Sequence, residues 1–194
     1  NAGAGWMLIP IYEFLQTYGD AVITTFDASL IKMYGKDTFD VRKDVYEPLL
    51  KKAYNFWKQI GNPEYYTDTD GNARYEKGKC SLNAGEHYLI IPSFSPENKP
   101  LGYHSAITAN AAMDISAAKD VINMYTEMLN YTKVDGYEQA VSEAEALLRL
   151  LPDFMYDESG AVKEWSMKEY GENNAHRHIS HLYPAWPALQ TQHD

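Results

Sequence analysis

Residues 108–129, TANAAMDISAAKDVINMYTEML, decide the fold class of this chain. Apolar side chains recur here every three or four residues, which is the period of an α-helix with one buried face. The hydroxyl of Thr108 is of the kind that caps a helix N-terminus, so we expect a helix from Ala109 to about Leu129. Its core face consists of Ile115, Ala118, Val121, Ile122, Tyr125, Met128 and Leu129.

Other helical runs lie on both sides of this stretch. The run Trp6–Tyr18 is amphipathic, provided that Pro10 lies in its first turn or kinks it, and Ala21–Met33 gives a weaker signal. Pro48 suits the first position of a helix that reaches about Ile60. Tyr137–Leu151 is amphipathic as well. The chain is therefore expected to be mainly helical.

The segment 62–85 is polar and rich in turn-forming residues. Asp70-Gly71, with Thr and Tyr residues nearby, predicts a β-hairpin. The string Asp68-Thr69-Asp70-Gly71 resembles part of a calcium-binding loop, but the later acid of such a loop is not in register, which favours the hairpin. The apolar run His87–Ile91 predicts a short strand that leads into Pro92.

The expected architecture is all-α, built from helix hairpins with a small β-hairpin-like insertion. The 194 residues suffice for one domain with a core. Helix signals begin at once, and the chain ends just after an apolar, aromatic segment. We therefore expect residues 1–194 to be a fragment of a single domain, truncated at both ends.

Composition and charge limit the partners of the chain. Its net charge of −10, without a basic run, disfavours nucleic acid and anionic membrane surfaces. No stretch reaches the roughly 18 apolar residues that span a bilayer. Aromatic residues make up 13%, which suits stacking on sugar rings but also suits a helical core. The single Cys80 leaves the compartment open, and a periplasmic or secreted bacterial protein is our best guess.

The loop Ser95-Pro96-Glu97-Asn98 is the first candidate for chemistry. Glycoside hydrolysis needs a carboxylic acid that protonates the leaving oxygen, and Glu97 after a short strand could supply it. The alternative is structural: Ser95 as a helix cap, Pro96 as the first helical residue and Glu97 as a first-turn acid.

The densest polar cluster contains three histidines and an arginine: His176, Arg177, His178 and His181. Imidazoles are common metal ligands, but these three do not share one helical face and no nearby acid completes a known spacing, so no metal site is expected. Sugar binding is favoured, because Arg and His donate hydrogen bonds to hydroxyls in fixed directions. An ion-paired helix start is the alternative. For the acids Asp114 and Glu164, orientation of a neighbour and a purely structural role both stay open.

The order of these motifs resembles glycoside hydrolase family 95, the inverting α-L-fucosidases, which also includes α-L-galactosidases. The resemblance covers nearly the whole chain and rests mainly on two long strings. They are Pro92-Ser93-Phe94-Ser95-Pro96-Glu97-Asn98 and His176-Arg177-His178-Ile179-Ser180-His181-Leu182-Tyr183-Pro184, with Gly5-Trp6-Met7, Tyr46-Glu47-Pro48 and Lys163-Glu164-Trp165 in the same order.

The resemblance implies part of an (α/α)6 barrel that holds the sugar in its central pocket. By residue match, Glu97 is similar to the general acid, Arg177 and His178 to sugar-contacting residues, and Trp6 to a residue of the pocket wall. Supporting roles are implied for Asn98, Asp114, Glu164 and His176. No cofactor and no metal are implied. The expected substrate is a glycan with a terminal α-L-fucose or a related L-sugar.

The family's water-activating partners, an Asn from an Asn-x-Asn motif and an Asp from an Asp-Gly-Asn-Phe-Gly-like segment, do not occur in this sequence. The fragment is therefore expected to be inactive alone, and a partial barrel is expected to self-associate through uncovered apolar helix faces. Asn173-Asn174-Ala175 and Tyr183-Pro184-Ala185-Trp186-Pro187 depart from the family pattern, which leaves the sugar specificity open. The alternatives are an α-L-galactosidase and a non-catalytic helical carbohydrate-binding or interaction domain.

Overall fold

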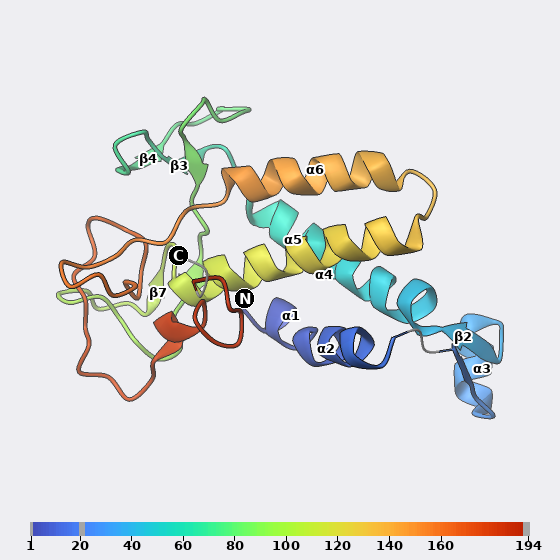
Figure 1. Cartoon of the computed structure of the whole chain (residues 1–194). Helices are drawn as coiled ribbons and strands as arrows, with labels where there is room; N and C mark the ends of the chain where they lie inside the picture. The colour runs from blue at the N-terminus through green and yellow to red at the C-terminus, as the bar shows by residue number, and fades with distance from the viewer. Residues whose placement is uncertain (1, 20–21, 192–194) are drawn as a thin grey trace.

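The computed structural model describes residues 2–19 and 22–191. Helix α5, Ala112–Thr132, runs through the middle of the helical part and packs against α1, α4 and α6 (Figure 1). Its buried side chains lie on several sides, because neighbours cover more than one face. The expected core face of this helix is buried, and this prediction is confirmed.

The predicted start of this helix is wrong. Thr108 does not cap it, because Thr108 pairs with Ser93 in the two-stranded sheet of β6, Ser93–Phe94, and β7, Ile107–Thr108. Asn110 then has a φ of 51°, which is incompatible with a helix, so α5 begins at Ala112. Backbone pairing with a distant strand thus overrides the local capping signal.

Two long helices flank α5. Helix α4, Glu47–Ile60, follows a π-helix, η1, at Val41–Tyr46, and has Pro48 in its first turn as expected. The Tyr54 ring of α4 stacks on Tyr125 of α5, with centroids 4.9 Å apart. Helix α6, Tyr137–Leu150, follows α5 after a short turn and packs along it as a helix hairpin. The expected helix-hairpin packing is present here.

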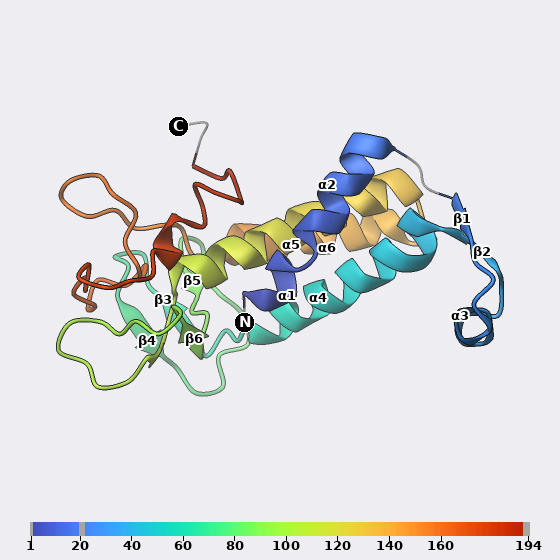
Figure 2. The ribbon, with the colours of Figure 1, turned by 90° about the horizontal axis from the view of Figure 1, so that it is seen from below.

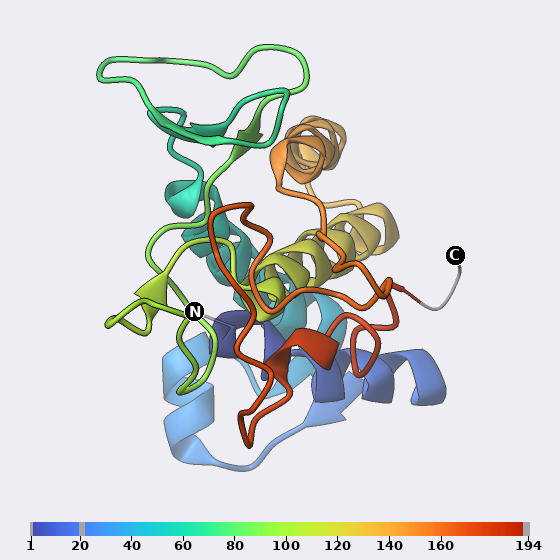
Figure 3. The same cartoon turned by 90° about the vertical axis from the view of Figure 1, so that its left-hand side faces the viewer.

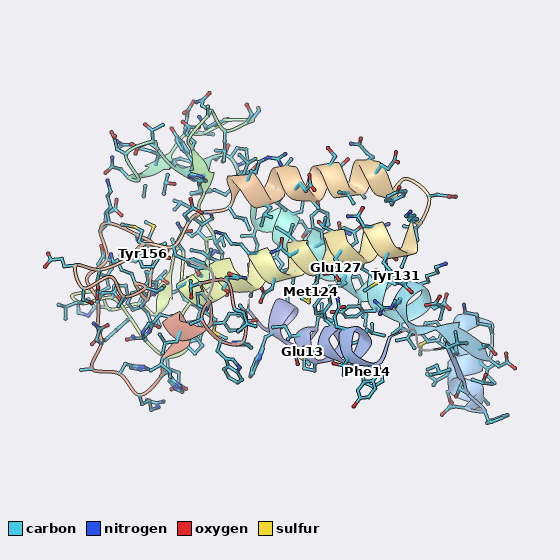
Figure 4. All side chains as sticks on the ribbon, in the orientation of Figure 1. Glu13, Phe14, Met124, Glu127, Tyr131 and Tyr156 are labelled. Carbon is cyan, nitrogen blue, oxygen red and sulfur yellow. The ribbon has the colours of Figure 1, made fainter. Side chains whose placement is uncertain are left out.

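The N-terminal helical run is two helices, not the single one expected. Helix α1, Gly3–Trp6, and helix α2, Ile9–Tyr18, are separated at Met7 and Leu8, and Pro10 lies in the first turn of α2. Both lie beside α5 in the view from below (Figure 2). Tyr12 and Gln16 of α2 donate hydrogen bonds to Glu127, which Figure 4 labels on α5.

The run Ala21–Met33 was wrongly predicted as one helix, and its first residue lies outside the described part of the chain. Strand β1, Val22–Thr24, pairs antiparallel with β2, Thr38–Asp40, because β-branched residues open the run. Helix α3, Ala28–Tyr34, starts only after Asp27, whose carboxylate caps the N–H groups of Ser29 and Leu30. This unit projects from one end of the molecule (Figure 2).

The predicted hairpin at Asp70-Gly71 is confirmed. It joins β3, Tyr65–Thr67, to β4, Ala73–Tyr75. The carboxylate of Asp68 accepts backbone N–H groups of Asp70 and Asn72, and the guanidinium of Arg74 pairs with it. These bonds give Asp68 a turn-forming role. Strand β5, His87–Tyr88, pairs with β3 and is shorter than the expected His87–Ile91.

The molecule is helix-rich with small sheets, so the helical part of the expected architecture is confirmed. Loops and short strands gather in front of the helices when they are viewed end-on (Figure 3). The short 3₁₀ helix η2, Ser180–Leu182, lies there too and contacts α5. No helix in residues 2–19 and 22–191 is long and apolar enough to cross a membrane.

Gly5 provides a test of the contact between α1 and α5. A Cβ added there would lie 2.8 Å from the carbonyl oxygen of Ala117 and 3.0 Å from Cγ2 of Val121. We expect Gly5→Ala to lower the free energy of unfolding by about 1 to 3 kcal/mol, because the backbones must separate. Urea unfolding measures this change. Gly3→Ala is the matched control, since a Cβ there meets nothing within 4 Å, and equal effects of the two variants would refute the tight contact.

Candidate active site

Glu97 lies in a turn between β6 and β7, not in a helix. The N–H of Asn98 donates to the carbonyl oxygen of Ser95 at 3.0 Å, which closes the turn. The structural alternative, in which Ser95 caps a helix that starts at Pro96, is therefore wrong. Glu97 itself has a φ of 57°, in the left-handed region that costs a non-glycine residue about 1 to 2 kcal/mol. Such a conformation persists only if its surroundings fix it.

Two side chains from the segment 176–181 meet the Glu97 carboxylate. The Arg177 guanidinium forms an ion pair with Oε2 of Glu97, and Nε2 of His178 lies 3.3 Å from the same oxygen. The Glu97 side chain is 56% exposed, so this cluster opens to solvent. His176 contacts the backbone of His178, because its Nδ1 accepts the N–H of His178 at 3.2 Å. Four predicted site residues are thus brought together from segments about 80 residues apart.

Asp114 holds the strand that precedes the Glu97 turn. It is fully buried in the first turn of α5. Its Oδ2 accepts the Ser93 hydroxyl at 2.7 Å and the Phe94 N–H at 3.1 Å. The Ser93 oxygen in turn accepts the Ala111 N–H at 2.9 Å. Asp114 therefore contacts the β6 backbone and not Glu97.

Glu164 is another buried carboxylate of this site, and it is hydrogen-bonded to two segments that lie far apart in the sequence. Ser95 donates to its Oε1, and Nδ1 of His181 lies 2.7 Å from its Oε2. The bond to Glu164 raises the pKa of His181, and this outweighs the opposing effect of burial. The N–H of Glu164 donates to Oε2 of Glu172 at 2.8 Å, and burial raises the pKa of Glu172.

Asn98 fixes the far side of the turn. Its side chain is 1% exposed and donates to the carbonyl oxygen of Asn173 at 3.2 Å. The Asn173 amide donates back to Oδ1 of Asn98 at 3.2 Å. This pair joins the Glu97 turn to the segment just before His176.

Trp6 lines a cleft that His178 of the ion-paired cluster also lines. The cleft has a volume of about 580 Å³ and is mainly apolar. His178 and Pro96 form its border with the Glu97 turn, and Trp6 contributes from α1. Trp186, which is 76% exposed, lines the same cleft and was not predicted as a site residue. An aromatic cleft of this kind can stack on the apolar face of a sugar.

Sequence reasoning did not predict Glu172 and Trp186 as site residues, it considered Ser95 only as a helix cap, and it gave His181 no role apart from the cluster as a whole. Their partners are distant in sequence, so no local spacing marks them. Among the described residues, no three His, Cys, Asp or Glu side chains are grouped in a way that could hold a metal ion.

A model of the glycosyl hydrolase family 95 catalytic domain matches residues 33–194. The chain belongs to glycosyl hydrolase family 95. The matched range includes Glu97, Asp114, Glu164 and the His176–His181 segment, while Trp6 precedes it. The predicted family, and with it the class of glycoside hydrolases, is confirmed.

A curated relative agrees with this family. The chain is 26% identical, over 101 residues, to a protein of Arabidopsis thaliana named Alpha-L-fucosidase 2. The match spans 50% of this chain and 12% of the plant protein. The family 95 chain thus corresponds to a small part of that relative.

The pair of His181 and Glu164 predicts a pH-dependent stability. Protonated His181 contributes its pairing in full below the unfolded pKa of about 6.5, and this contribution is lost as the pH rises through the raised folded pKa. Glu164 and Glu172 are the charged groups that raise it. We expect the stability advantage of the wild type over His181→Asn to shrink as the pH rises above about 6.5. Urea unfolding at a series of pH values measures it.

The control for this experiment removes the charge of the closer carboxylate. When both proteins also carry Glu164→Gln, the effect of His181→Asn on the free energy of unfolding should vary much less with pH, because the main charged partner is gone. An effect of His181→Asn that is independent of pH in the presence of Glu164 would contradict the prediction.

Proposed function

We propose that the full-length protein hydrolyses terminal α-L-fucosyl residues with inversion, and that Glu97 is its general acid. The observation that carries this proposal is the meeting of Glu97 with Arg177 and His178 beside an aromatic cleft, in a chain of family 95. The name of the plant relative supports fucose as the sugar.

Inverting hydrolysis needs two groups on opposite faces of the sugar. We propose that Glu97 protonates the leaving oxygen, while Arg177 and His178 donate hydrogen bonds to sugar hydroxyls. Trp6 would stack on the sugar from the cleft wall, and Asn98, Asp114, Glu164 and His176 would keep these groups in place. The second group, which activates water, would come from outside this chain's sequence.

The ion pair with Arg177 favours the charged carboxylate of Glu97, whereas proton donation needs the neutral acid. We propose that a sugar hydroxyl takes the place of Glu97 on the guanidinium when substrate binds. The exposure of Arg177, at 69%, makes its side chain accessible for this exchange. The carboxyl group would then face the leaving oxygen without a competing cation.

We also propose that the chain is part of an (α/α)6 barrel, truncated at both ends and inactive alone. The α5–α6 hairpin, with α4 and the N-terminal helices packed on α5, supports a layered helical domain. Inactivity would follow because acid and base act together on one bond.

The Glu97→Gln variant of the full-length protein tests the acid. The amide keeps the shape of the side chain but has no acidic proton, so kcat on an unactivated α-L-fucoside should fall about 10²- to 10⁴-fold while fucose binding persists. Glu158→Gln, an exposed acid in another turn, should leave kcat unchanged. Near-normal turnover by Glu97→Gln would refute the assignment. A parallel assay on an α-L-galactoside separates the two sugars.

Self-association of the isolated chain is a separate expectation. Helices α2 and α3 expose apolar side chains, with Tyr18 at 73%, Met33 at 72% and Phe14 at 49%. Burial of such side chains between copies is favourable. We expect sedimentation velocity to show species larger than a monomer. A monodisperse monomer would contradict this expectation.

A further inference from the structure

A single buried carboxylate joins the two segments that meet at Glu97. Oε1 of Glu164 accepts the hydroxyl of Ser95, two residues before Glu97. Oε2 of Glu164 is paired with Nδ1 of His181, three residues after His178. The turn that carries the acid and the segment that carries its partners are thus attached to the two oxygens of one side chain.

The backbone around Glu164 is fixed to the helical core. Its carbonyl oxygen accepts the N–H of Ala112, the first residue of α5, at 3.0 Å. Trp165, next in sequence, is fully buried and forms a bridge with Ala111. Glu164 therefore cannot easily move with either segment, so the positions of both segments depend on it.

Burial makes both bonds of Glu164 necessary. The side chain is 3% exposed, and a buried charged carboxylate is costly unless its oxygens are hydrogen-bonded. Ser95 supplies a neutral donor, so His181 is the partner that can carry a positive charge. The His181 side chain is 22% exposed and belongs to η2, which contacts α5.

We propose that His181 is a positioning residue of the acid step: through Glu164 it fixes Arg177 and His178 relative to Glu97. This inference rests on the proposed function, in which Glu97 is the general acid. His181 bonds to Glu164 and does not line the described cleft. Its effect is expected on proton donation to the leaving group, because that step depends on where the Glu97 carboxyl group points relative to the sugar that Arg177 and His178 hold.

The dependence of kcat on the leaving group distinguishes a loss of positioning from a general loss of active-site structure. In the full-length protein, His181→Ala should lower kcat on an unactivated α-L-fucoside about 10- to 100-fold, with KM changed little, since small displacements cost about this much. An aryl α-L-fucoside with a strongly acidic phenol needs no protonation, so its kcat should change less than about threefold. Equal losses on both substrates would overturn the proposal.

A double-mutant cycle with Glu97→Gln then tests whether the loss of kcat in His181→Ala arises at the acid step. If His181 acts through the acid, His181→Ala should cause little further loss in a Glu97→Gln background, because the affected step is already absent. Multiplicative losses would overturn the proposal. If Glu97→Gln itself spares the unactivated substrate, the proposed function fails instead, so the two failures are distinguishable.

Two conservative variants show whether the loss of kcat in His181→Ala comes from misfolding. The amide nitrogen of Asn can stand where Nδ1 of His181 stands, whereas that of Gln reaches the position of Nε2. His181→Asn should therefore recover most of the kcat that His181→Ala loses, and His181→Gln should recover less. If both variants match His181→Ala while their unfolding midpoints equal that of the wild type, the bond to Glu164 does not position the acid.

Discussion

A carboxylate removed from water is costly unless hydrogen bonds compensate it, and this constraint shapes the region around Glu97. Asp114 and Glu164 are both buried near the start of α5, where an unpaired charge would cost several kcal/mol. Oδ2 of Asp114 accepts from Ser93 and Phe94, and Glu164 is bonded to His181 and to Ser95, so three consecutive residues ahead of Glu97 contact these two carboxylates. The cost of burying these two carboxylates thereby dictates where the strand and the turn must lie.

The helical core fixes the positions of these two carboxylates. Helix α5 is covered by α1, α4 and α6, and its first turn carries Asp114 and anchors the backbone of Glu164. Because close-packed helices move little, the two carboxylates are fixed points for the loops. The left-handed φ of Glu97 is then the consequence of a turn held at both ends, by Ser95 on one side and Asn98 on the other.

The parts of the fold that depend on local periodicity could be predicted from the sequence, and so could part of the site. The helices α4, α5 and α6 and the hairpin at Asp70-Gly71 follow from apolar spacing and turn residues. Prediction failed where a tertiary contact competes with a local signal. Thr108 and Ser95 are both good helix caps, yet Thr108 pairs with Ser93 in the sheet of β6 and β7, and Ser95 donates to Glu164. The order of two long motifs marked Glu97, but nothing local gave His181 a role, because it acquires its partner only through the tertiary fold.

Exposure and rigidity are separated within this site, and that separation suits the role of general acid that we propose for Glu97. Glu97 and Arg177 are more than half exposed, whereas the side chains that hold the Glu97 turn are buried. An exposed ion pair of this kind contributes little to stability, so the exchange for sugar hydroxyls that we propose would cost little. The buried bonds keep the backbone in place during that exchange. In the proposed mechanism Glu97 can therefore change partners without losing its position, because the backbone of its turn is held by Glu164, Asp114 and Asn98 and not by Arg177.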